Sequence, residues 1–476
     1  MAYQTIKINT EQLRNIEHTF GSPRLYSATG QPHGLNDQFF AELYRQNYTL
    51  IFEPAEHKFY QYSDSTGLWE SITCEKLTEQ ITQCCSTYLC LSGLSLVIPD
   101  FRFCRNVMQI LKGKSEQQNF FQQPLPGHRV HCANCVLEYN SETQSWDRKE
   151  FSPEDRSRNR TEIAYEPEAQ APEFLEKLLR PAMNEDDLEL LQLYVGQCLL
   201  KENVSQKFLI ISGTAGAGKS TLVNVIEMLI NHANCTELRT EHMNGRFENS
   251  RFVGKTLLTG KDVKSSFLDT RGASNLKALT GKDTLTTEFK HSNETIDIVG
   301  NFNVIITSNS TLHVRLENDG AAWKRRMLWI KYDNPPPKDP IENFDKYLIK
   351  TEGSGILNWA LEGARKLLAQ GGKIKLSEGQ EHRIDALLEE TDPVRLFVRD
   401  SIMLCEGKDV SSSELWSAFG IYRERREFEA VTKTKFMRML PDIMEQEFHV
   451  TMSNHIKRRG NFVRGYSGVV IRPLLG

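Results

Sequence analysis

The segment Gly213-Thr-Ala-Gly-Ala-Gly218-Lys219-Ser220 fits the pattern G-x-x-x-x-G-K-[ST] of a phosphate-binding loop. It follows an apolar run, 207–212, that suits a buried strand, and it precedes a helix-like run. Glycines let backbone N–H groups curl around a phosphate, and a helix N-terminus favours an anion. We expect Lys219 to bridge the β- and γ-phosphates of a nucleotide and Ser220 to ligate Mg²⁺. The expected nucleotide contacts are Gly213, Thr214, Ala215, Gly216, Ala217, Gly218, Lys219, Ser220 and Thr221.

Three later groups have the residue types that phosphoanhydride hydrolysis needs. Asp262 follows the apolar run 256–259, where an acid would hold the Mg²⁺ shell or polarise the attacking water. Asn309 follows the run 303–307, where its amide could orient that water or sense the γ-phosphate. Arg325 and Arg326 precede the run 327–331 and suit an arginine finger that reaches a neighbouring subunit. Each signal is weak alone, because such residues are often turn or surface residues, and their order and spacing give the set its weight.

The elements that must position these residues are short apolar strands alternating with helices. We predict strands at 207–212, 256–259, 303–307 and 327–331, a helical region from Pro172, and an amphipathic helix from Gly353. This alternation predicts an α/β core with a parallel sheet. We place an N-terminal domain at 1–165, the ATPase core with helical flanks at 166–375, and a C-terminal domain at 376–476.

The last hundred residues predict three helices followed by a hairpin, which is the plan of a winged helix. The hairpin contains Lys457, Arg458, Arg459 and Arg464, and such side chains can neutralise DNA phosphates. A solvated charge cluster on a small domain is an equal alternative.

Composition limits the remaining possibilities. The chain has 476 residues, a net charge of -4 and 25% charged residues, so it is globular and any nucleic-acid surface must be local. No apolar run is long enough for a membrane span, and the N-terminus has no secretion signal, so we expect a cytoplasmic protein with no membrane partner. The ten cysteines are too sparse for a disulfide scaffold. We expect Cys84, Cys85 and Cys90 to lie in a core.

A zinc site is an alternative use of one cluster. His128, His131, Cys132 and Cys135 have the ligand types and C-x-x-C spacing of a tetrahedral site. The cluster lacks a distant second pair of ligands, so we expect no zinc there.

The motifs GTAGAGKS, LLTGKDV, LKALTGKDTLTTEFKHSNETIDI, NVIITSN and AAWKRRMLWI resemble, in order and spacing, the superfamily 3 helicases of phages, plasmids and small DNA viruses. The phage/plasmid primase-helicase family, which includes the poxvirus-type enzymes, is the most similar. The likeness is specific within 207–332, extends into GILNWALEG, and is weaker upstream and in the C-terminal region.

This resemblance implies an AAA-type ring, usually hexameric, that hydrolyses ATP between subunits and moves 3′ to 5′ on single-stranded or forked DNA. Such an enzyme would serve replication of a phage, plasmid or other mobile element, in a bacterial host or a viral replication compartment, with a separate primase or initiator as partner. The implied roles are Walker A residues Lys219 and Ser220, Walker B acid Asp262, sensor Asn309, finger Arg326 with Arg325 as its substitute, and pore-hairpin residues Lys290 and His291 between Thr284 and Val299.

Two departures from the family pattern bear on activity. Many viral members have two acids in Walker B, whereas Lys261 stands at the first position here. The chain also has no paired-carboxylate motif for a primase, so we predict no primase activity. Two other functions stay open: an ATPase that loads or remodels a replication partner, and an origin-binding initiator ATPase without processive unwinding.

Overall fold

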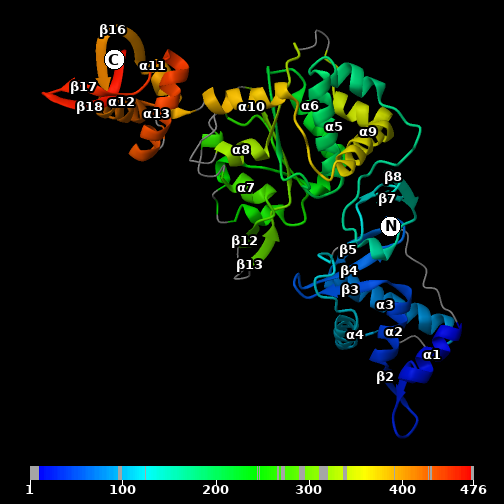
Figure 1. The fold of residues 1–476 in the computed structure, drawn as a ribbon. Helices are drawn as coiled ribbons and strands as arrows, with labels where there is room; N and C mark the ends of the chain where they lie inside the picture. The colour runs from blue at the N-terminus through cyan, green and yellow to red at the C-terminus, as the bar shows by residue number, and fades with distance from the viewer. Residues whose placement is uncertain are drawn as a thin grey trace. The chain divides into compact units, whose positions relative to one another are not determined.

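The chain divides into two compact units, Met1–Tyr165 and Glu166–Gly476, which are taken separately below. The computed structural model describes residues 10–94, 99–123, 125–243, 245, 247–264, 267–269, 274–288, 295–309, 320–335, 340–390, 392–426, 428 and 431–472 (Figure 1). None of the helices in these ranges combines the length and apolar character needed to cross a bilayer.

The first unit combines helices with antiparallel sheets. Its helices are α1 (Thr10–Phe20), α2 (Asp37–Asn47), α3 (Cys74–Leu91) and α4 (Phe101–Lys114). A short strand pair is formed by β1 (Arg24–Tyr26) and β2 (Pro32–Leu35). One three-stranded sheet contains β3 (Leu50–Glu53), β4 (Lys58–Ser63) and β5 (Leu68–Ile72), and another contains β6 (Arg129–His131), β7 (Val136–Asn140) and β8 (Ser145–Lys149). A 3-10 turn, η1 (Pro153–Asp155), follows.

Side-chain caps and aromatic packing hold these helices. The N-cap residues Asn36, Thr73 and Asp100 immediately precede α2, α3 and α4, and the side chain of each accepts a hydrogen bond from backbone N–H in the first turn of its helix. Phe40 packs edge-on against Tyr88 of α3 at 5.8 Å between ring centroids. Cys84 and Cys85 are buried in this core as expected, but the prediction for Cys90 was wrong because its side chain is exposed on α3.

The second unit is built on a five-stranded parallel sheet, which confirms the expected α/β class. The strand order is β10 (Cys235–Glu237), β11 (Leu257–Gly260), β14 (Asn303–Ser308), β9 (Phe208–Ser212) and β15 (Met327–Lys331). Every residue of β9, β11 and β14 is buried, which is typical of parallel strands covered on both faces. The carboxyl ends of these strands meet at one edge.

Helices cover both faces of this sheet (Figure 1). One side has α5 (Glu185–Leu199), α6 (Lys219–Ile230) and α9 (Phe344–Ala369), and the other has α7 (Ser274–Thr280), α8 (Gly320–Arg326) and α10 (Glu378–Glu390). Phe208 and Ile210 of β9 join the core cluster on the α7, α8 and α10 side. The remaining elements are a π-helical turn η2 (Phe174–Leu179), the 3-10 turns η3 (His232–Asn234), η4 (Thr240–His242), η5 (Asn249–Phe252) and η6 (Phe267–Asp269), and the hairpin of β12 (Thr284–Glu288) with β13 (Thr295–Val299).

A network of amide side chains closes the amino-terminal edge of the sheet. Gln197, at the end of α5, donates to Asn303 Oδ1 at 2.8 Å and to Asn203 Oδ1 at 3.1 Å. Asn203 donates through Nδ2 to the carbonyls of Lys207 and Phe302, at 2.7 and 2.8 Å. All three amides are fully buried, so their mutual hydrogen bonds satisfy groups that would otherwise be costly to desolvate.

The C-terminal part of this unit has a three-stranded antiparallel sheet and three helices. In chain order the elements are α11 (Pro393–Ser401), β16 (Ile402–Ser411), α12 (Ser412–Arg425), α13 (Lys433–Phe448), β17 (Ser453–Arg458) and β18 (Asn461–Ile471), and the strand order is β16-β18-β17. Phe419 stacks on Phe436 at 4.7 Å between centroids, which joins α12 to α13.

Most predicted elements lie within a few residues of their expected positions. The four core strands, the helix around Gly353 and the C-terminal helices and hairpin are present. The sequence analysis predicted neither α10 nor β16, six of whose ten residues are exposed.

Helices α5 and α9 pack closely at the positions where each has a glycine. A Cβ atom on Gly363 would lie 2.0 Å from the Gln192 carbonyl oxygen, and one on Gly196 would lie 2.1 Å from the Ala364 nitrogen. These distances are too short for any side chain, so the two helix backbones are in contact at this point.

We predict that Gly363→Ala lowers the thermal stability of the full chain, measured by circular dichroism. Overpacking of this kind typically costs about 1–3 kcal/mol. Gly420→Ala on α12 is the matched control, because a Cβ there meets no atom within 4 Å. Removal of a helical glycine without a clash should be neutral or stabilise by about 0.5–1 kcal/mol. Equal melting temperatures for the two variants would contradict the glycine contact.

Candidate functional site

The loop between β9 and α6 has a backbone that requires glycine. Gly216 and Gly218 have φ values of 78° and 100°. A Cβ on Gly213 would lie 1.9 Å from the carbonyl oxygen of Tyr332, the residue after β15. The loop is therefore held directly against the end of the neighbouring strand.

Lys219 is the first residue of α6, and its side chain turns back into this loop. Its Nζ donates to the carbonyls of Gly213 and Thr214 at 2.7 and 2.8 Å. The residue is only 4% exposed, and burial lowers the pKa of its ammonium, whereas the charges of Asp262 and Asp333 act to raise that pKa. The loop thus concentrates one cation beside two carboxylates.

The same loop also contains backbone donors without a partner. Ala217 N–H is bonded to the Thr214 carbonyl at 3.3 Å, whereas the N–H groups of Ala215, Gly216 and Gly218 have no partner among the described residues. Ser220 follows at an exposed position in the first turn of α6. Free N–H groups beside an ammonium at a helix N-terminus form a cradle that suits phosphate oxygens.

Asp262 and Asn309 meet at the ends of β11 and β14. Asn309 Nδ2 donates to Asp262 Oδ1 at 3.1 Å. Asp262 has φ 51°, and its backbone N–H donates to Thr307 Oγ1 at 3.1 Å, so its left-handed turn is held by β14. The carboxylate and the amide predicted from sequence are therefore neighbours at the same sheet edge as the loop.

Lys261, which lies between β11 and Asp262, pairs with side chains of α6. Its Nζ contacts Glu227 Oε2 and Asn224 Oδ1, both at 2.8 Å, and both partners lie on α6. Thr259 Oγ1 donates to Glu227 Oε1 at 2.5 Å. Lys261, the residue before Asp262, is therefore a cation that links β11 to α6.

Asp333 is a site residue that the sequence analysis missed. It follows β15, contributes to the electrostatics of Lys219, and forms an ion pair with Lys331 at 2.7 Å. It also lines a pocket of about 310 Å³ with the segment 181–184, Asp187 and Arg383. An acid two residues past the end of the fourth predicted strand was the signal that could have identified it.

The two candidate finger residues differ in exposure. Arg325 is exposed at the end of α8, and its backbone carbonyl accepts a hydrogen bond from Lys207 Nζ at 2.6 Å. Arg326 is partly buried, and its Nη2 lies 2.9 Å from the position of a Cβ on Gly281. The side chain of Arg326 thus packs within its own unit, and Arg325 is the one placed on the surface.

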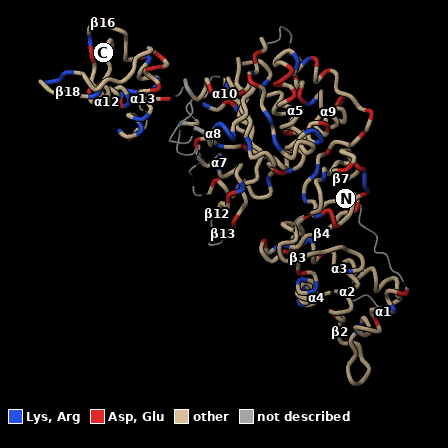
Figure 2. The backbone as a smooth tube through the Cα atoms, in the orientation of Figure 1, with Lys and Arg blue, Asp and Glu red and all other residues tan. Residues whose placement is uncertain are grey.

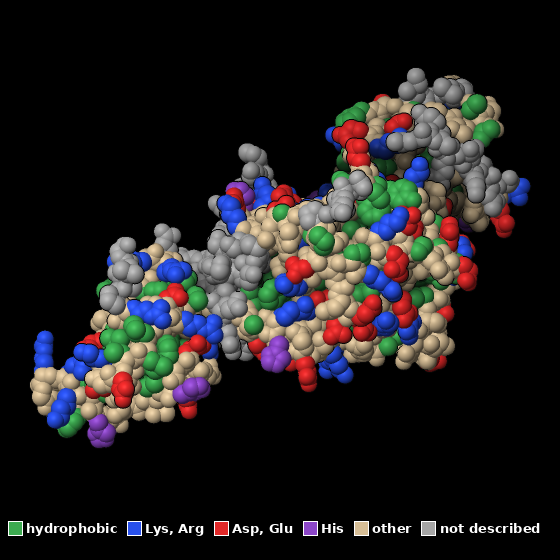
Figure 3. Space-filling model, turned by 90° about the horizontal axis from the view of Figure 1, so that it is seen from above, with side chains coloured by type: hydrophobic (Ala, Val, Ile, Leu, Met, Phe, Trp, Pro, Cys, Tyr) green, Lys and Arg blue, Asp and Glu red, His purple; other side chains and the backbone are tan. Residues whose placement is uncertain are grey.

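The expected DNA-contacting residues lie in two regions. Lys290 and His291 fall outside the described residues, while the strands that flank them, β12 and β13, pair in register from Thr284 opposite Val299. In the C-terminal hairpin, Lys457, Arg459 and Arg464 are exposed. Figure 3 shows Lys and Arg side chains at the outer tip of this region, at the left of the view.

Arg458 differs from the other hairpin cations. It forms a bidentate ion pair with Glu414 of α12, at 2.8 and 2.9 Å, and donates to the Asp409 carbonyl. The hydrogen bond from Arg458 lowers the pKa of Glu414 to about 2. Its guanidinium is therefore engaged in attaching the hairpin to α12.

Three of the four residues of the zinc alternative, His131, Cys132 and Cys135, are buried. His131 Nε2 lies 3.1 Å from the Thr66 carbonyl, and its ring stacks on Phe151 at 4.9 Å. Cys132 and Cys135 are buried in the turn between β6 and β7. Among the residues that the structure describes, no three His, Cys, Asp or Glu side chains gather as metal ligands.

Comparisons with known proteins find one family model that matches part of the chain and solved structures that are similar over most of it. Residues 211–326 match the model of a family of unknown function, DUF5906. No curated protein matches the sequence. The A-form apo structure of the NrS-1 C-terminal region is similar over 90% of this chain and 98% of that chain, with a TM-score of 0.45 and 14% identity. An apo structure of NrS-1 C-terminal region (305-718) has the same coverage and TM-score at 12% identity. The segment matched by the family model contains Lys219, Asp262, Asn309 and Arg325.

Proposed function

We propose that this chain is a P-loop ATPase that uses Mg²⁺ and acts as a DNA helicase. The observation that carries the proposal is the convergence of Lys219, Asp262 and Asn309 at the carboxyl edge of the parallel sheet. Ligands of open α/β sheets bind at this edge. A buried ammonium and free loop N–H groups supply the donors, and a carboxylate and an amide supply the groups for metal and water, that phosphoryl transfer from a nucleoside triphosphate needs.

Each residue has a definite task in this proposal. The loop N–H groups and Lys219 hold the phosphate oxygens and stabilise the charge that develops on them. Ser220 and Asp262 offer the hydroxyl and carboxylate oxygens that suit Mg²⁺, which would supply charge neutralisation at the phosphates. Asn309, already bonded to Asp262, orients the attacking water, and Asp262 accepts its proton. Lys261 takes no part, because it is paired with Glu227.

We predict that Asp262→Asn and Lys219→Ala each reduce ATP hydrolysis by about 10²-fold or more, since each removes a charge needed at the transition state. Lys255→Ala is the matched lysine control, because its Nζ contacts only the Ala233 carbonyl at 2.7 Å among described groups. Phosphate release measured with saturating Mg²⁺ tests the prediction. Full hydrolysis by Asp262→Asn would show that the acid lies elsewhere, with Asp333 as the next residue to change.

The exposure of Arg325 supports an assembly in which each subunit supplies an arginine to the ATP site of its neighbour. Arg325 lies at the surface, and in this proposal it contacts the ATP of a neighbouring copy in a ring, which the family resemblance suggests is hexameric. A guanidinium supplied in this way stabilises the transition-state charge.

We predict that Arg325→Ala reduces ATP hydrolysis by about 10³-fold. Mixing this variant with Lys219→Ala should restore part of the activity, because an interface between the two variants can combine an intact Lys219 from one subunit with an intact Arg325 from the other. Lys324→Ala on the same helix is the control, since Lys324 is paired with Asp385 at 2.7 Å. If mixing restores nothing while both variants still assemble, Arg325 does not act across an interface.

DNA contact is proposed at two places in the second unit. The β12–β13 hairpin would present Lys290 and His291 to a single strand in the ring, and the C-terminal elements would act as a winged helix through Lys457, Arg459 and Arg464. The order α11, β16, α12, α13, β17, β18 and the strand order β16-β18-β17 support that second role. The alternatives are a loader or remodeller and an origin-binding initiator, which would hydrolyse ATP without processive unwinding.

We predict ATP-dependent unwinding of a duplex with a 3′ single-stranded tail and not of one with a 5′ tail. Lys290→Ala should abolish unwinding and keep ATP hydrolysis, because it removes the DNA contact and not the nucleotide site. Strand displacement measured beside phosphate release separates the two. Hydrolysis without unwinding of either substrate by the wild-type chain would favour the loader or initiator.

A further inference from the structure

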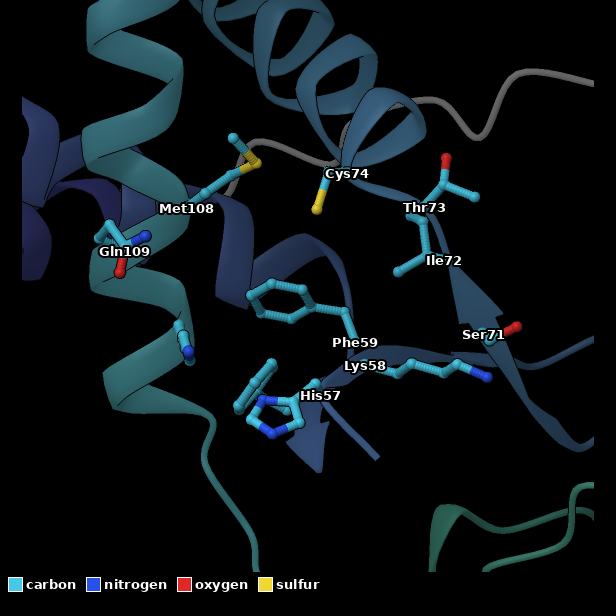
Figure 4. Close-up of a pocket in the computed structure, with 11 residues that line it drawn as sticks. His57, Lys58, Phe59, Ser71, Ile72, Thr73, Cys74, Met108 and Gln109 are labelled. Atoms are coloured by element: carbon cyan, nitrogen blue, oxygen red, sulfur yellow. The ribbon is translucent and has the colours of Figure 1, made fainter. Parts of the chain in front are cut away.

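The first unit contains a pocket of about 390 Å³ between the β3–β4 hairpin, the start of α3 and one face of α4 (Figure 4). Phe59, Ile72 and Met108 give it an apolar wall, and His57, Lys58 and Lys112 supply basic groups. In Figure 4 the Phe59 ring, the Met108 thioether and the Cys74 thiol face the same space. No carboxylate is among the residues that line it.

The face of α4 that borders the pocket continues as a basic and aromatic stripe. Phe101, Arg105, Met108 and Lys112 are spaced at i, i+4, i+7 and i+11, which places them on one side of a helix. The helix contains no acidic residue, and its basic positions are marked in Figure 2. At about 1.5 Å per residue the stripe is roughly 16 Å long.

Phe101 and Arg105 of this stripe are exposed, whereas Met108 and Lys112 are half-buried at the pocket and Met108 also packs against the core. Phe101 is 73% exposed, which is unusual for a phenylalanine at the start of a well-packed helix. Arg105 is exposed and has no hydrogen bond or ion pair with a described residue. Lys112 Nζ lies 4.5 Å from the centroid of the Phe52 ring, at the pocket. The opposite side of α4 contrasts, because Lys114 is paired with Glu42 at 3.2 Å.

We propose that the pocket and this stripe bind single-stranded nucleic acid. One unpaired base enters the pocket against Phe59 and Met108, Lys112 and Arg105 neutralise the adjoining phosphates, and a second base stacks on Phe101. Aromatic platforms alternating with cations are the chemistry that recognises unstacked nucleotides. A base held in a duplex is not free to enter the pocket, so the proposed ligand is single-stranded. The surface lies in the first unit and does not depend on ATP hydrolysis in the second.

The first test is equilibrium binding of a short fluorescent DNA oligonucleotide to the full chain without nucleotide triphosphate, in the wild type and in Lys219→Ala. The double variant R105E/K112E should weaken binding about 10-fold or more and reduce the salt dependence of log K by roughly 1 to 2 units, as expected for two lost phosphate contacts. The control K76E/K114E makes the same change in charge elsewhere in this unit, at two lysines that form ion pairs. Equal weakening by both doubles would overturn the proposal.

The second test needs no substitution. Cys74 lines the pocket, and Cys90, also exposed, lies further along α3. Alkylation by iodoacetamide, followed at each cysteine by peptide mass spectrometry, should slow at Cys74 and not at Cys90 when the oligonucleotide is bound. Protection by thymidine monophosphate at the same nucleotide concentration would instead identify a site for a free nucleotide. Unchanged alkylation of Cys74 with the oligonucleotide would overturn the proposal.

Discussion

Strand β14 is the element on which the candidate site depends. Its Thr307 side chain accepts the N–H of Asp262, its Thr307 carbonyl accepts the N–H of Val263, and its own end presents Asn309. On its other edge it pairs with β9, with Ser308 opposite Ser212 immediately before the glycine loop. β14 therefore holds the Asp262 carboxylate, the Asn309 amide and the glycine loop at the same edge of the sheet. A one-residue slip of this pairing would turn every side chain to the opposite face and separate all three.

The parts of the fold that were predictable were those with strong local signals. Apolar runs bounded by glycine or polar residues defined β9, β11, β14 and β15, because strands covered on both faces can tolerate little else. The loop motif fixed the position of Lys219. Helix α10 was not predicted because most of its residues are polar and only a few apolar residues pack toward the sheet. Strand β16 was not predicted because most of its residues are exposed.

The site was less predictable than the strands because several of its contacts join residues far apart in sequence. The proximity of Asp333 to Lys219 depends on β15 lying beside β9, a neighbour relation that no local pattern encodes. The engagement of Arg458 with Glu414 removes a cation that composition alone would assign to DNA. Similarly, the choice between Arg325 and Arg326 depends on which side chain packs on the Gly281 turn. The sequence identified the residue types at the site, and tertiary packing determines which of these side chains are bonded within the chain and which can contact a ligand.

The amide network at the amino-terminal edge of the sheet has a consequence for how the unit responds to its surroundings. Gln197, Asn203 and Asn303 have no ionisable group, and the adjacent Tyr194 hydroxyl, which bonds to Val304, has a pKa raised well above its usual value by burial. This edge therefore keeps its hydrogen bonds across the whole physiological range of acidity. The charged groups of the candidate site, Lys219, Asp262 and Asp333, lie at the opposite edge, so the sheet is anchored by neutral amides at one end and has its charged residues for chemistry at the other.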